Sequence, residues 1–457
     1  MDEEKTVRKV FRKLRKQQLA DFRRRMPDGK NGVEVEIGGR KFVAAVRRLT
    51  PRECARLQTV PEWYKFVTSE TQQYKGLGNG WNVETIKHCF SFLPERLKRK
   101  PLTVLSLFDG ISCGQMALRD MGMGVEKYIA SEIDSYAIEN TQHNYPGTVQ
   151  VGSVVDIDVD ELVREHGVPD LLIGGSPCQS FSFAGRMKGM TTKHGEEVCT
   201  LEKYMQLKGE GFEFEGQSYL FWEYVRVLRE LRRYNPDIVF FLENVRMQEK
   251  WERMVSHAVG VRGVHIDSAL VSAQHRSRIY WSNMRVRIAG GEILLYGDGD
   301  PFTWPPLATD IPQPEDRDAV IRDVLQAGVD SKYYLDGGLV GRLVGSMDKA
   351  KLRTLLEPQV GEKEAEEYMK WNPEYDDLLN EEIRDMVRSG YEKERERLKR
   401  LLDDGEDNGC MEKDDNLRRI MGNLVPPASK SNALLATMWK GAMANGCACV
   451  MELYEED

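Results

Sequence analysis

Between residues 101 and 290, short apolar runs alternate with segments whose apolar residues recur at helical spacing. The apolar runs lie at 101–110, 125–134, 169–177, 236–245 and 276–286. Their β-branched and aromatic residues are typical of buried strands, whereas the spacing within 115–123 and 219–235 is typical of amphipathic helices. This alternation predicts a doubly wound α/β sheet, a fold that binds ligands at the carboxyl ends of its strands.

The pattern changes after residue 290, where Gly- and Pro-rich sequence leads into a densely charged stretch from about 355 to 416. Alternating charges of this kind are typical of a pair of solvated helices, and a partner-binding arm is the alternative interpretation. The basic segment 8–25 also has two interpretations, a solvated helix or a helix that contacts phosphates.

Composition narrows the class of protein. The chain has 457 residues, of which 41% are hydrophobic and 30% are charged, enough for one large domain with a smaller one. No apolar run is long enough to span a bilayer and the N-terminus is charged throughout, so we expect an intracellular protein without membrane contact. The net charge of −8 argues against indiscriminate coating of nucleic acid, but it leaves room for a local basic cleft.

The eight cysteines form no C-x-x-C pair and no His/Cys cluster at zinc-finger spacing. We therefore expect reduced thiols, no disulfide framework and no metal site. No heptad pattern indicates an oligomer seam, so the expected state is a monomer.

Acidic residues follow the first predicted strands. The run "SLFDGISCG" ends in a small-residue turn that lets backbone N–H groups approach a ligand. Glu132 follows the next strand at roughly the ~20-residue offset where an acid accepts ribose hydroxyls, and Asp156 lies at a further probable strand end. Each acid alone is more simply a turn carboxylate or helix cap. Together, with no Lys-Ser/Thr phosphate loop, they favour an adenosyl cofactor without phosphates.

Later strand ends carry residues suited to catalysis. Cys178 lies in the exposed turn of "LLIGGSPCQSFSFAG", where a thiol can act as a nucleophile rather than pack as a small apolar side chain. Glu243 ends the apolar run "FFLENV" and could serve as a general acid. In "SAQHRSRIYW", Gln274 precedes Arg276 and Arg278, which period 2 places on one face of a strand. These arginines could bind an oxygen of a bound base or pair with surface acids.

In this order the segments resemble the cytosine-5 DNA methyltransferase family, especially the branch that includes the mammalian de novo methyltransferases. The shared features are the F-D-G turn, "SEI", "GGSPCQSFS", "ENV" and the Q-x-R-x-R strand. The resemblance implies a Rossmann-like S-adenosylmethionine-dependent fold with a mixed sheet and a smaller target-recognition domain. The sequence departs from many bacterial members at Ser112 and Cys113, where they have glycines, and at Ser176, where they have proline.

The order of motifs is unusual at both ends of the chain. Segments 46–64 and 71–93 resemble the last two motifs of the family, and 428–446 resembles the segment that normally precedes them. We therefore predict a circular permutation, which costs little when the termini lie close together at the surface. The predicted parts are an N-terminal segment packing on the catalytic domain, the catalytic domain, the target-recognition domain with its charged insertion and a C-terminal tail, at 1–100, 101–290, 291–446 and 447–457.

The resemblance assigns a role to each candidate residue. Cys178 would add to C6 of cytosine, Glu243 would hold the N3 proton, and Arg278 and Arg276 would hold the base O2 and nearby phosphates. The base must first leave the helical stack. The residues implied to contact S-adenosylmethionine are Phe108, Asp109, Gly110, Ile111, Glu132, Ile133, Asp156, Ile157, Pro177 and Asn79. Segment 185–221 resembles the mobile active-site loop of the family, with an insertion.

Three functions remain open. The expected one is methylation of double-stranded DNA, with a cognate restriction endonuclease as a conceivable further partner. An RNA branch of the family uses the same Cys and Glu on tRNA, although the large region 291–446 favours DNA. A silent binding module is the third, and the intact "SPCQ", "ENV" and "QHRSR" segments argue against it.

Overall fold

The computed structural model describes residues 19–20, 22–24, 26, 32–37, 40–177, 196–211, 216–289, 300–326, 328–345 and 449–455. Several sequence-based predictions lie outside the described residues. They are the nucleophile Cys178, the charged stretch 355–416, and most of the segments 8–25 and 291–446.

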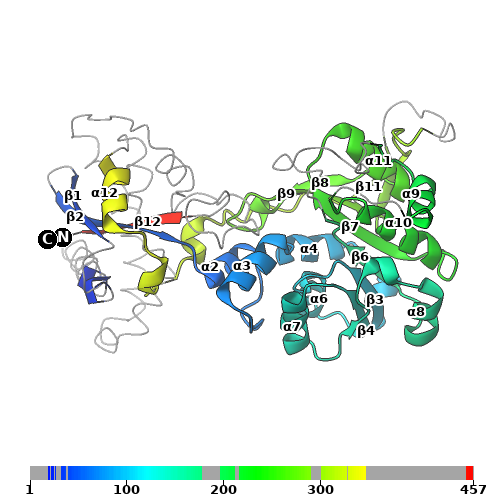
Figure 1. Ribbon diagram of the computed structural model, residues 1–457, viewed down its shortest axis with the longest axis horizontal. Coiled ribbons are helices and arrows are strands. Elements are labelled where there is room, and N and C mark those ends of the chain that lie inside the picture. Colours follow the sequence, from blue (N-terminus) through cyan, green and yellow to red (C-terminus); the bar gives the residue numbers. More distant parts are fainter. Residues whose placement is uncertain are drawn as a thin grey trace.

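The main body is a seven-stranded sheet in the order β5-β4-β3-β6-β7-β9-β8 (Figure 1). Its strands are β3 (Leu102–Leu107), β4 (Val125–Ser131), β5 (Val149–Gln150), β6 (Leu171–Gly174), β7 (Val239–Val245), β8 (Val264–Asp267) and β9 (Ser277–Ser282). Strands β5, β4, β3, β6 and β7 pair in parallel, whereas β9 is antiparallel to both β7 and β8. The chain runs outward from β3 to β5 and then returns to β6 on the other side of β3. Doubly wound sheets bind ligands at such a reversal, beyond the carboxyl ends of the strands.

Alternate residues of the central strands face two separate apolar layers. Leu171 and Ile173 belong to one buried cluster, whereas Leu172 between them belongs to the other. Helices α2 (Pro51–Leu57), α3 (Glu70–Asn79), α4 (Val83–Phe90), α5 (Glu95–Lys98) and α6 (Cys113–Asp120) contribute to the first cluster. Helices α8 (Val159–His166), α9 (Leu201–Gly209), α10 (Leu220–Leu231) and α11 (Glu249–Val259) contribute to the second. Burial on both faces explains why these strands read as continuous apolar runs.

This architecture confirms the predicted α/β fold. Each of the five apolar runs contains a strand, namely β3, β4, β6, β7 and β9, and the two predicted helices correspond to α6 and α10. The position of Asp156 differs from the prediction, because it lies in a 3-10 turn, η1 (Val154–Asp156), six residues after β5 ends. The turn forms because the Ser153 hydroxyl accepts a hydrogen bond from the N–H of Val155 at 3.3 Å, which caps it.

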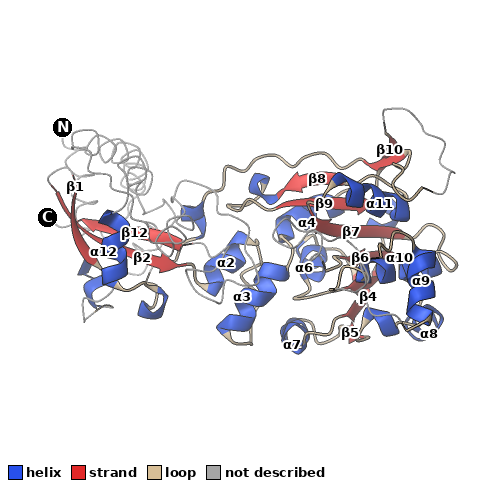
Figure 2. Ribbon diagram, turned by 45° about the horizontal axis from the view of Figure 1, so that its top comes forward, coloured by secondary structure: helices blue, strands red, loops and turns tan. Residues whose placement is uncertain are grey.

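A second, three-stranded sheet lies beyond α2 and α3 at the other end of the molecule (Figure 1). Its central strand β2 (Arg40–Arg48) pairs antiparallel with β1 (Val33–Ile37) and with β12 (Cys449–Glu455). Helix α12 (Gly337–Gly345) packs against β1 and β2. The strand β12 thus places residues 449–455 beside a strand near the start of the chain (Figure 2).

A buried ion pair fixes the joint between β2 and α2. The Arg47 guanidinium donates two hydrogen bonds of 2.8 Å to the Glu53 carboxylate, and both side chains are fully buried. Glu53 also closes the capping box of α2, since its carboxylate accepts from the N–H of Thr50 while the Thr50 hydroxyl accepts from the N–H of Glu53. The same carboxylate accepts from the N–H of Gln326 at 2.8 Å. One acidic side chain therefore joins the end of β2 and the start of α2 to a segment 273 positions further along the chain.

The remaining described elements lie around these two sheets. They are α7 (Ser135–Asn144), the hairpin of β10 (Val286–Ile288) with β11 (Leu307–Thr309), and the 3-10 turns η2 (Ser268–Leu270), η3 (Ile321–Val324) and η4 (Ser331–Tyr333). Within the described part of the chain, none of the helices has the length and apolar character needed to cross a membrane.

Candidate active site

Three residues of the turn after β3 have a positive φ angle. Phe108 and Ser112 have φ of 59° and 65°, and Gly110 has φ of 57°, all in the left-handed region. The Gly110 N–H donates to Glu132 Oε2 at 2.8 Å. Glu132 follows β4, and its other oxygen accepts from the N–H groups of Ile133 and Asp134, also at 2.8 Å. The acid predicted to bind ribose hydroxyls therefore meets the small-residue turn, as expected for adjacent parallel strands.

Asp109 contributes an acid with an unsatisfied oxygen. Its Oδ1 accepts from the Ser106 hydroxyl at 2.6 Å and the Tyr128 hydroxyl at 2.8 Å. Its Oδ2 is buried and has no hydrogen-bond partner among the described residues. Burial raises the pKa of the Asp109 carboxyl to about 6. A buried polar atom without a partner is rare, so Oδ2 is suited to a donor group of a ligand.

Other predicted cofactor residues border the same edge. Ile133 is 70% exposed, which is unusual for a large apolar side chain and leaves a surface on which an aromatic ring could pack. Asp156 and Asn79 are also exposed, whereas Ile157 is buried and Ile111 packs on α3, where a Cβ at Gly76 would lie 2.8 Å from it. Acidic acceptors beside an exposed apolar residue fit an adenosyl group.

Glu243, the predicted general acid, has two side-chain partners from distant parts of the sequence. It lies near the end of β7, is 8% exposed, and its Oε1 is 2.9 Å from Nε of Arg278. In the antiparallel pair β7–β9, Glu243 faces Tyr280 and Val245 faces Arg278, so Glu243 and Arg278 are diagonal neighbours. Its Oε2 accepts a hydrogen bond of 3.1 Å from the indole N–H of Trp81. The carboxylate is therefore fixed between a strand and the N-terminal helices.

Arg276 contacts the backbone at the end of α3. It is 4% exposed, and its guanidinium donates to the carbonyls of Gly78 and Gly80, with the shortest contact at 2.8 Å to Gly80. These glycines flank Asn79 at the end of α3, and the Asn79 side chain is exposed. These contacts place the Arg276 guanidinium against the backbone on both sides of Asn79.

The loop after β6 is hydrogen-bonded to the end of β7. The Asn244 amide donates to the Ser176 hydroxyl at 3.0 Å and to the Ser176 carbonyl at 3.3 Å. Gly175 lies so close to the site that a Cβ there would be 2.8 Å from Trp81 Nε1 and 2.9 Å from Glu243 Oε2. Pro177 follows, and the next residue, Cys178, lies outside the described residues. The chain therefore passes directly beside Glu243 three residues before Cys178.

Two residues of this site were missed by the sequence analysis. Trp81 follows the "LGNG" segment, so its position beside a matched motif was the available signal. Asn244 was visible as the middle residue of "ENV", but nothing in the sequence indicated its partner 68 positions away. Gln274 is fully buried, and neither polar atom of its amide has a hydrogen-bond partner among the described residues. It is a further polar group close to Arg276 and Arg278 in sequence.

The fold and the site define a Rossmann-like methyltransferase, and a comparison with known families identifies which one. The sequence profile of the family described as C-5 cytosine-specific DNA methylase matches residues 1–93 and 102–257, more than half of the chain. The chain therefore belongs to the C-5 cytosine-specific DNA methylase family. Methyltransferases of this family use S-adenosylmethionine, which the residues at the carboxyl edge fit.

Several phage and bacterial proteins are similar to this chain. The orphan methyltransferase M.SPRI of Bacillus phage SPR is 29% identical over 293 residues, which are 57% of this chain and 58% of that protein. M.Rho11sI of Bacillus phage rho11s is 29% identical over 288 residues, 56% and 50% of the two chains. The putative type II methyltransferase M.BsuMIIP of Bacillus subtilis (strain 168) is 27% identical over 296 residues, 55% and 63%. The chain thus spans between half and two thirds of each relative.

Among solved structures, the Dnmt2 methyltransferase of S. pombe shares 18% identity with this chain and covers 40% of it, with a TM-score of 0.28. A mutant of Spodoptera frugiperda DNMT2 shares 16% identity with the same TM-score. A TM-score this low says nothing about the fold, so the family assignment rests on the sequence match.

No group of His, Cys, Asp and Glu among the described residues could hold a metal ion.

Proposed function

We propose that this chain is a DNA (cytosine-5-)-methyltransferase that transfers a methyl group from S-adenosylmethionine to C5 of cytosine in duplex DNA. The observation that carries the proposal is the setting of Glu243. Its carboxylate is held between Arg278 and Trp81, at the sheet edge where β6 leads to Cys178. A nearly buried acid at the edge where the chain leads to a cysteine suits covalent catalysis on a pyrimidine.

In this proposal Cys178 supplies the nucleophile. Aromatic C5 of cytosine is too weak a nucleophile to take a methyl group directly. Addition of the Cys178 thiolate to C6, with the N3 proton held by Glu243, makes C5 enamine-like. C5 would then take the methyl group, with S-adenosylhomocysteine as the leaving group, after which loss of the C5 proton and expulsion of the thiolate would restore the aromatic ring. Arg278, already beside Glu243, would stabilise negative charge on the base O2.

The cofactor residues have separable tasks. Glu132 and Asp156 would accept hydrogen bonds from the adenosyl group, with Ile133 packing on its ring, and Asp109 Oδ2 would accept from a donor group. Phe108, Gly110, Ile111, Ile157, Pro177 and Asn79 would complete the lining of this cleft. When bound, S-adenosylmethionine supplies an electrophilic methyl group on sulfonium. Arg276 acts in this scheme as a positioning residue for the Asn79 turn.

Duplex DNA is the proposed substrate because the relatives named above are methyltransferases of phages and of Bacillus subtilis, and the family is one of DNA methylases. Reaching C6 requires the cytosine to flip out of the helix, at a cost of a few kcal/mol. The word "orphan" in the names of the phage relatives favours action without a cognate endonuclease. The proposed state is a monomer that acts inside the cell.

The order of motifs supports a circular permutation. Helices α2 to α4 from the N-terminal segment pack in the same apolar cluster as β3 and β6, which is where the last motifs of the family are needed. Strand β12 pairs antiparallel with β2, and Glu455 lies opposite Phe42, so a short connection could join these two strands.

The proposal is tested by transfer of labelled methyl from S-adenosylmethionine to duplex DNA and to tRNA. We expect labelling of DNA by the intact chain and at least a thousandfold loss in Cys178→Ala, because the covalent route is closed. Cys199→Ala is the matched control, since Cys199 is a half-buried thiol in the same segment of the chain. Labelling of tRNA alone would assign the chain to RNA, and labelling of neither would favour a silent binding module.

A covalent intermediate is tested separately with a duplex that carries 5-fluorocytosine. Fluorine at C5 cannot leave as a proton, so the adduct between Cys178 and the base persists. We expect a denaturation-resistant protein–DNA band with wild type and with Cys199→Ala, and none with Cys178→Ala. Methyl transfer without such a band would contradict the covalent route.

A further inference from the structure

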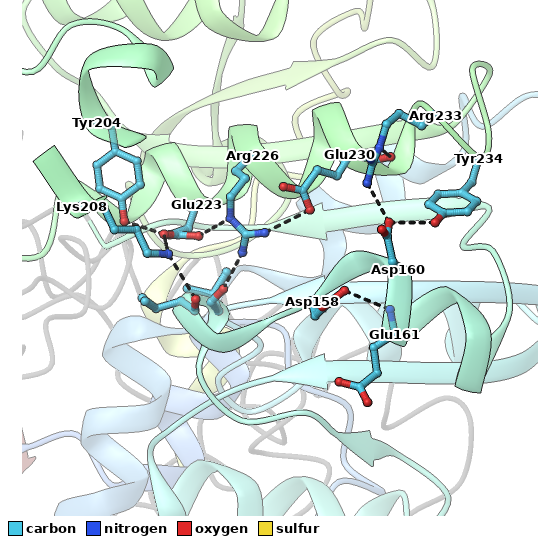
Figure 3. Close-up of polar contacts among 12 residues, drawn as sticks. Asp158, Asp160, Glu161, Tyr204, Lys208, Glu223, Arg226, Glu230, Arg233 and Tyr234 are labelled. Atoms are coloured by element: carbon cyan, nitrogen blue, oxygen red, sulfur yellow. Dashed lines mark hydrogen bonds and ion pairs between the residues drawn. The ribbon is translucent and has the colours of Figure 1, made fainter. Parts of the chain in front are cut away.

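A buried charge cluster lies away from the catalytic residues, around Glu223 of α10 (Figure 3). Glu223 is fully buried, and three donors converge on its carboxylate. Tyr204 and Lys208 of α9 reach Oε1 at 2.5 Å and 2.6 Å, and Nε of Arg226 reaches Oε2 at 2.7 Å. Arg226 also contacts Glu230 at 3.1 Å. The cluster thus balances two cations with two carboxylates.

Lys208 and Arg226 also donate hydrogen bonds to backbone carbonyls, and both of these carbonyls belong to the turn η1. Lys208 Nζ donates to the carbonyl of Val155 at 3.2 Å, and Arg226 Nη2 donates to the carbonyl of Val154 at 3.2 Å. Figure 3 shows both cations pointing from the helices toward this turn. Two backbone hydrogen bonds also hold the peptide planes of η1, from Asp156 to Ser153 at 3.1 Å and from Ile157 to Val154 at 3.4 Å.

The turn η1 links the buried cluster to the predicted cofactor residue Asp156. The turn ends at Asp156, whose side chain is exposed, so one side of η1 faces the cluster and the other faces solvent at the carboxyl edge of the sheet. A buried ion cluster seldom stabilises a fold more than apolar residues of the same volume would. What it can do is fix two carbonyls in one orientation.

We infer that Lys208 and Arg226, held by Glu223, are positioning residues that orient the Asp156 turn and thereby set the affinity for the adenosyl cofactor. The inference rests on the proposed function, because it takes Asp156 as a cofactor contact. It also assigns a task to α9, which lies in the segment that follows the nucleophile turn along the chain. This helix supports the cofactor edge through Lys208, whose side chain is partly accessible.

The test measures binding of S-adenosylhomocysteine by titration calorimetry to wild type, Lys208→Met and Arg229→Met. Arg229 is the matched control because it also joins α10 to α9, through Glu202 at 2.6 Å, but it does so at the surface and does not contact η1. We expect a Kd about tenfold higher for Lys208→Met, the lower end of the loss of a charge-assisted hydrogen bond. Arg229→Met should stay within twofold of wild type.

A merely structural role is separated by two further readouts. Positioning predicts a higher KM for S-adenosylmethionine with kcat nearly unchanged, and a Kd restored by Lys208→Arg, which can reach both acceptors. A structural role predicts a lower melting temperature of the unliganded protein with an unaltered Kd. If Lys208→Met does not fold, Lys208→Gln is measured against the same control.

The outcomes are distinguishable. A Kd for Lys208→Met equal to that of Arg229→Met would overturn the inference while the proposed function stands. Wild type that binds no S-adenosylhomocysteine and transfers no methyl group would overturn the proposed function, and the inference with it.

Discussion

Gly175 provides the sharpest test of how the active site is assembled. In Gly175→Ala the new Cβ would lie 2.8 Å from Trp81 Nε1 and 2.9 Å from Glu243 Oε2, whereas ordinary contacts begin near 3.4 Å. To reach ordinary contact, the indole nitrogen must move away by about 0.6 Å and the carboxylate oxygen by about 0.5 Å. Because the two atoms form a 3.1 Å hydrogen bond with each other, the methyl group separates the indole from the carboxylate.

The magnitude follows from two effects. Overpacking of a filled site costs about 1–3 kcal/mol, and a lost hydrogen bond to a charged group costs about 1.5–3 kcal/mol. The same movement of the indole away from the carboxylate relieves the crowding and breaks the hydrogen bond, so the two costs do not add in full. We therefore expect the free energy of unfolding to fall by about 2–4 kcal/mol. The measurement is urea unfolding followed by circular dichroism, with methyl transfer in parallel. Gly147→Ala is the control, since a Cβ there meets nothing within 4 Å and should change stability by less than about 0.5 kcal/mol.

A double-mutant cycle isolates the cause. Trp81→Phe removes the indole nitrogen, so Gly175→Ala should cost at least about 1 kcal/mol less in that background. Equal costs in both backgrounds, or a cost no larger than that of Gly147→Ala, would refute the crowding that we describe.

Two further predictions concern buried charges. Glu53→Gln should lower the free energy of unfolding by about 3–5 kcal/mol, because Arg47 remains fully buried without a counter-charge; the exposed Glu62→Gln should change it by less than about 1 kcal/mol, and similar melting shifts for both would contradict the account. For Asp109, burial raises the pKa from about 3.9 when unfolded to about 6, so the folded state retains a proton that the unfolded state releases. Its contribution to stability is therefore present below about pH 4 and is lost as pH rises to about 6, a change of about 3 kcal/mol that Asp109→Asn should remove. Urea unfolding at several pH values checks this prediction, and parallel pH profiles for wild type and variant would exclude it.

Sequence alone determined five of the seven strands of the large sheet and the position of Glu132 directly after one of them. Its strands are buried on both faces, so they appear as uninterrupted apolar runs, and polar residues directly after such runs must lie at the carboxyl edge of the sheet. For this reason the local pattern was enough to place Glu132 at the same edge as the Gly110 turn, to which it is hydrogen-bonded. The resemblance to the family came from the same local segments, read in order, and the family match confirms it.

Only the tertiary structure decided which partners these residues have. Trp81 and Glu243 are 162 positions apart, and Arg276 meets Gly80 across 196 positions. Such contacts depend on how the N-terminal helices pack across β7 and β9, which no local pattern encodes. The buried pair of Arg47 with Glu53 and the Glu223 cluster read in the sequence as ordinary charged residues on amphipathic elements. A sequence shows which residues are charged, but it does not show which of them are buried. Burial is a property of the packed fold, and it decides the desolvation free energy of a charge and which groups that charge can orient.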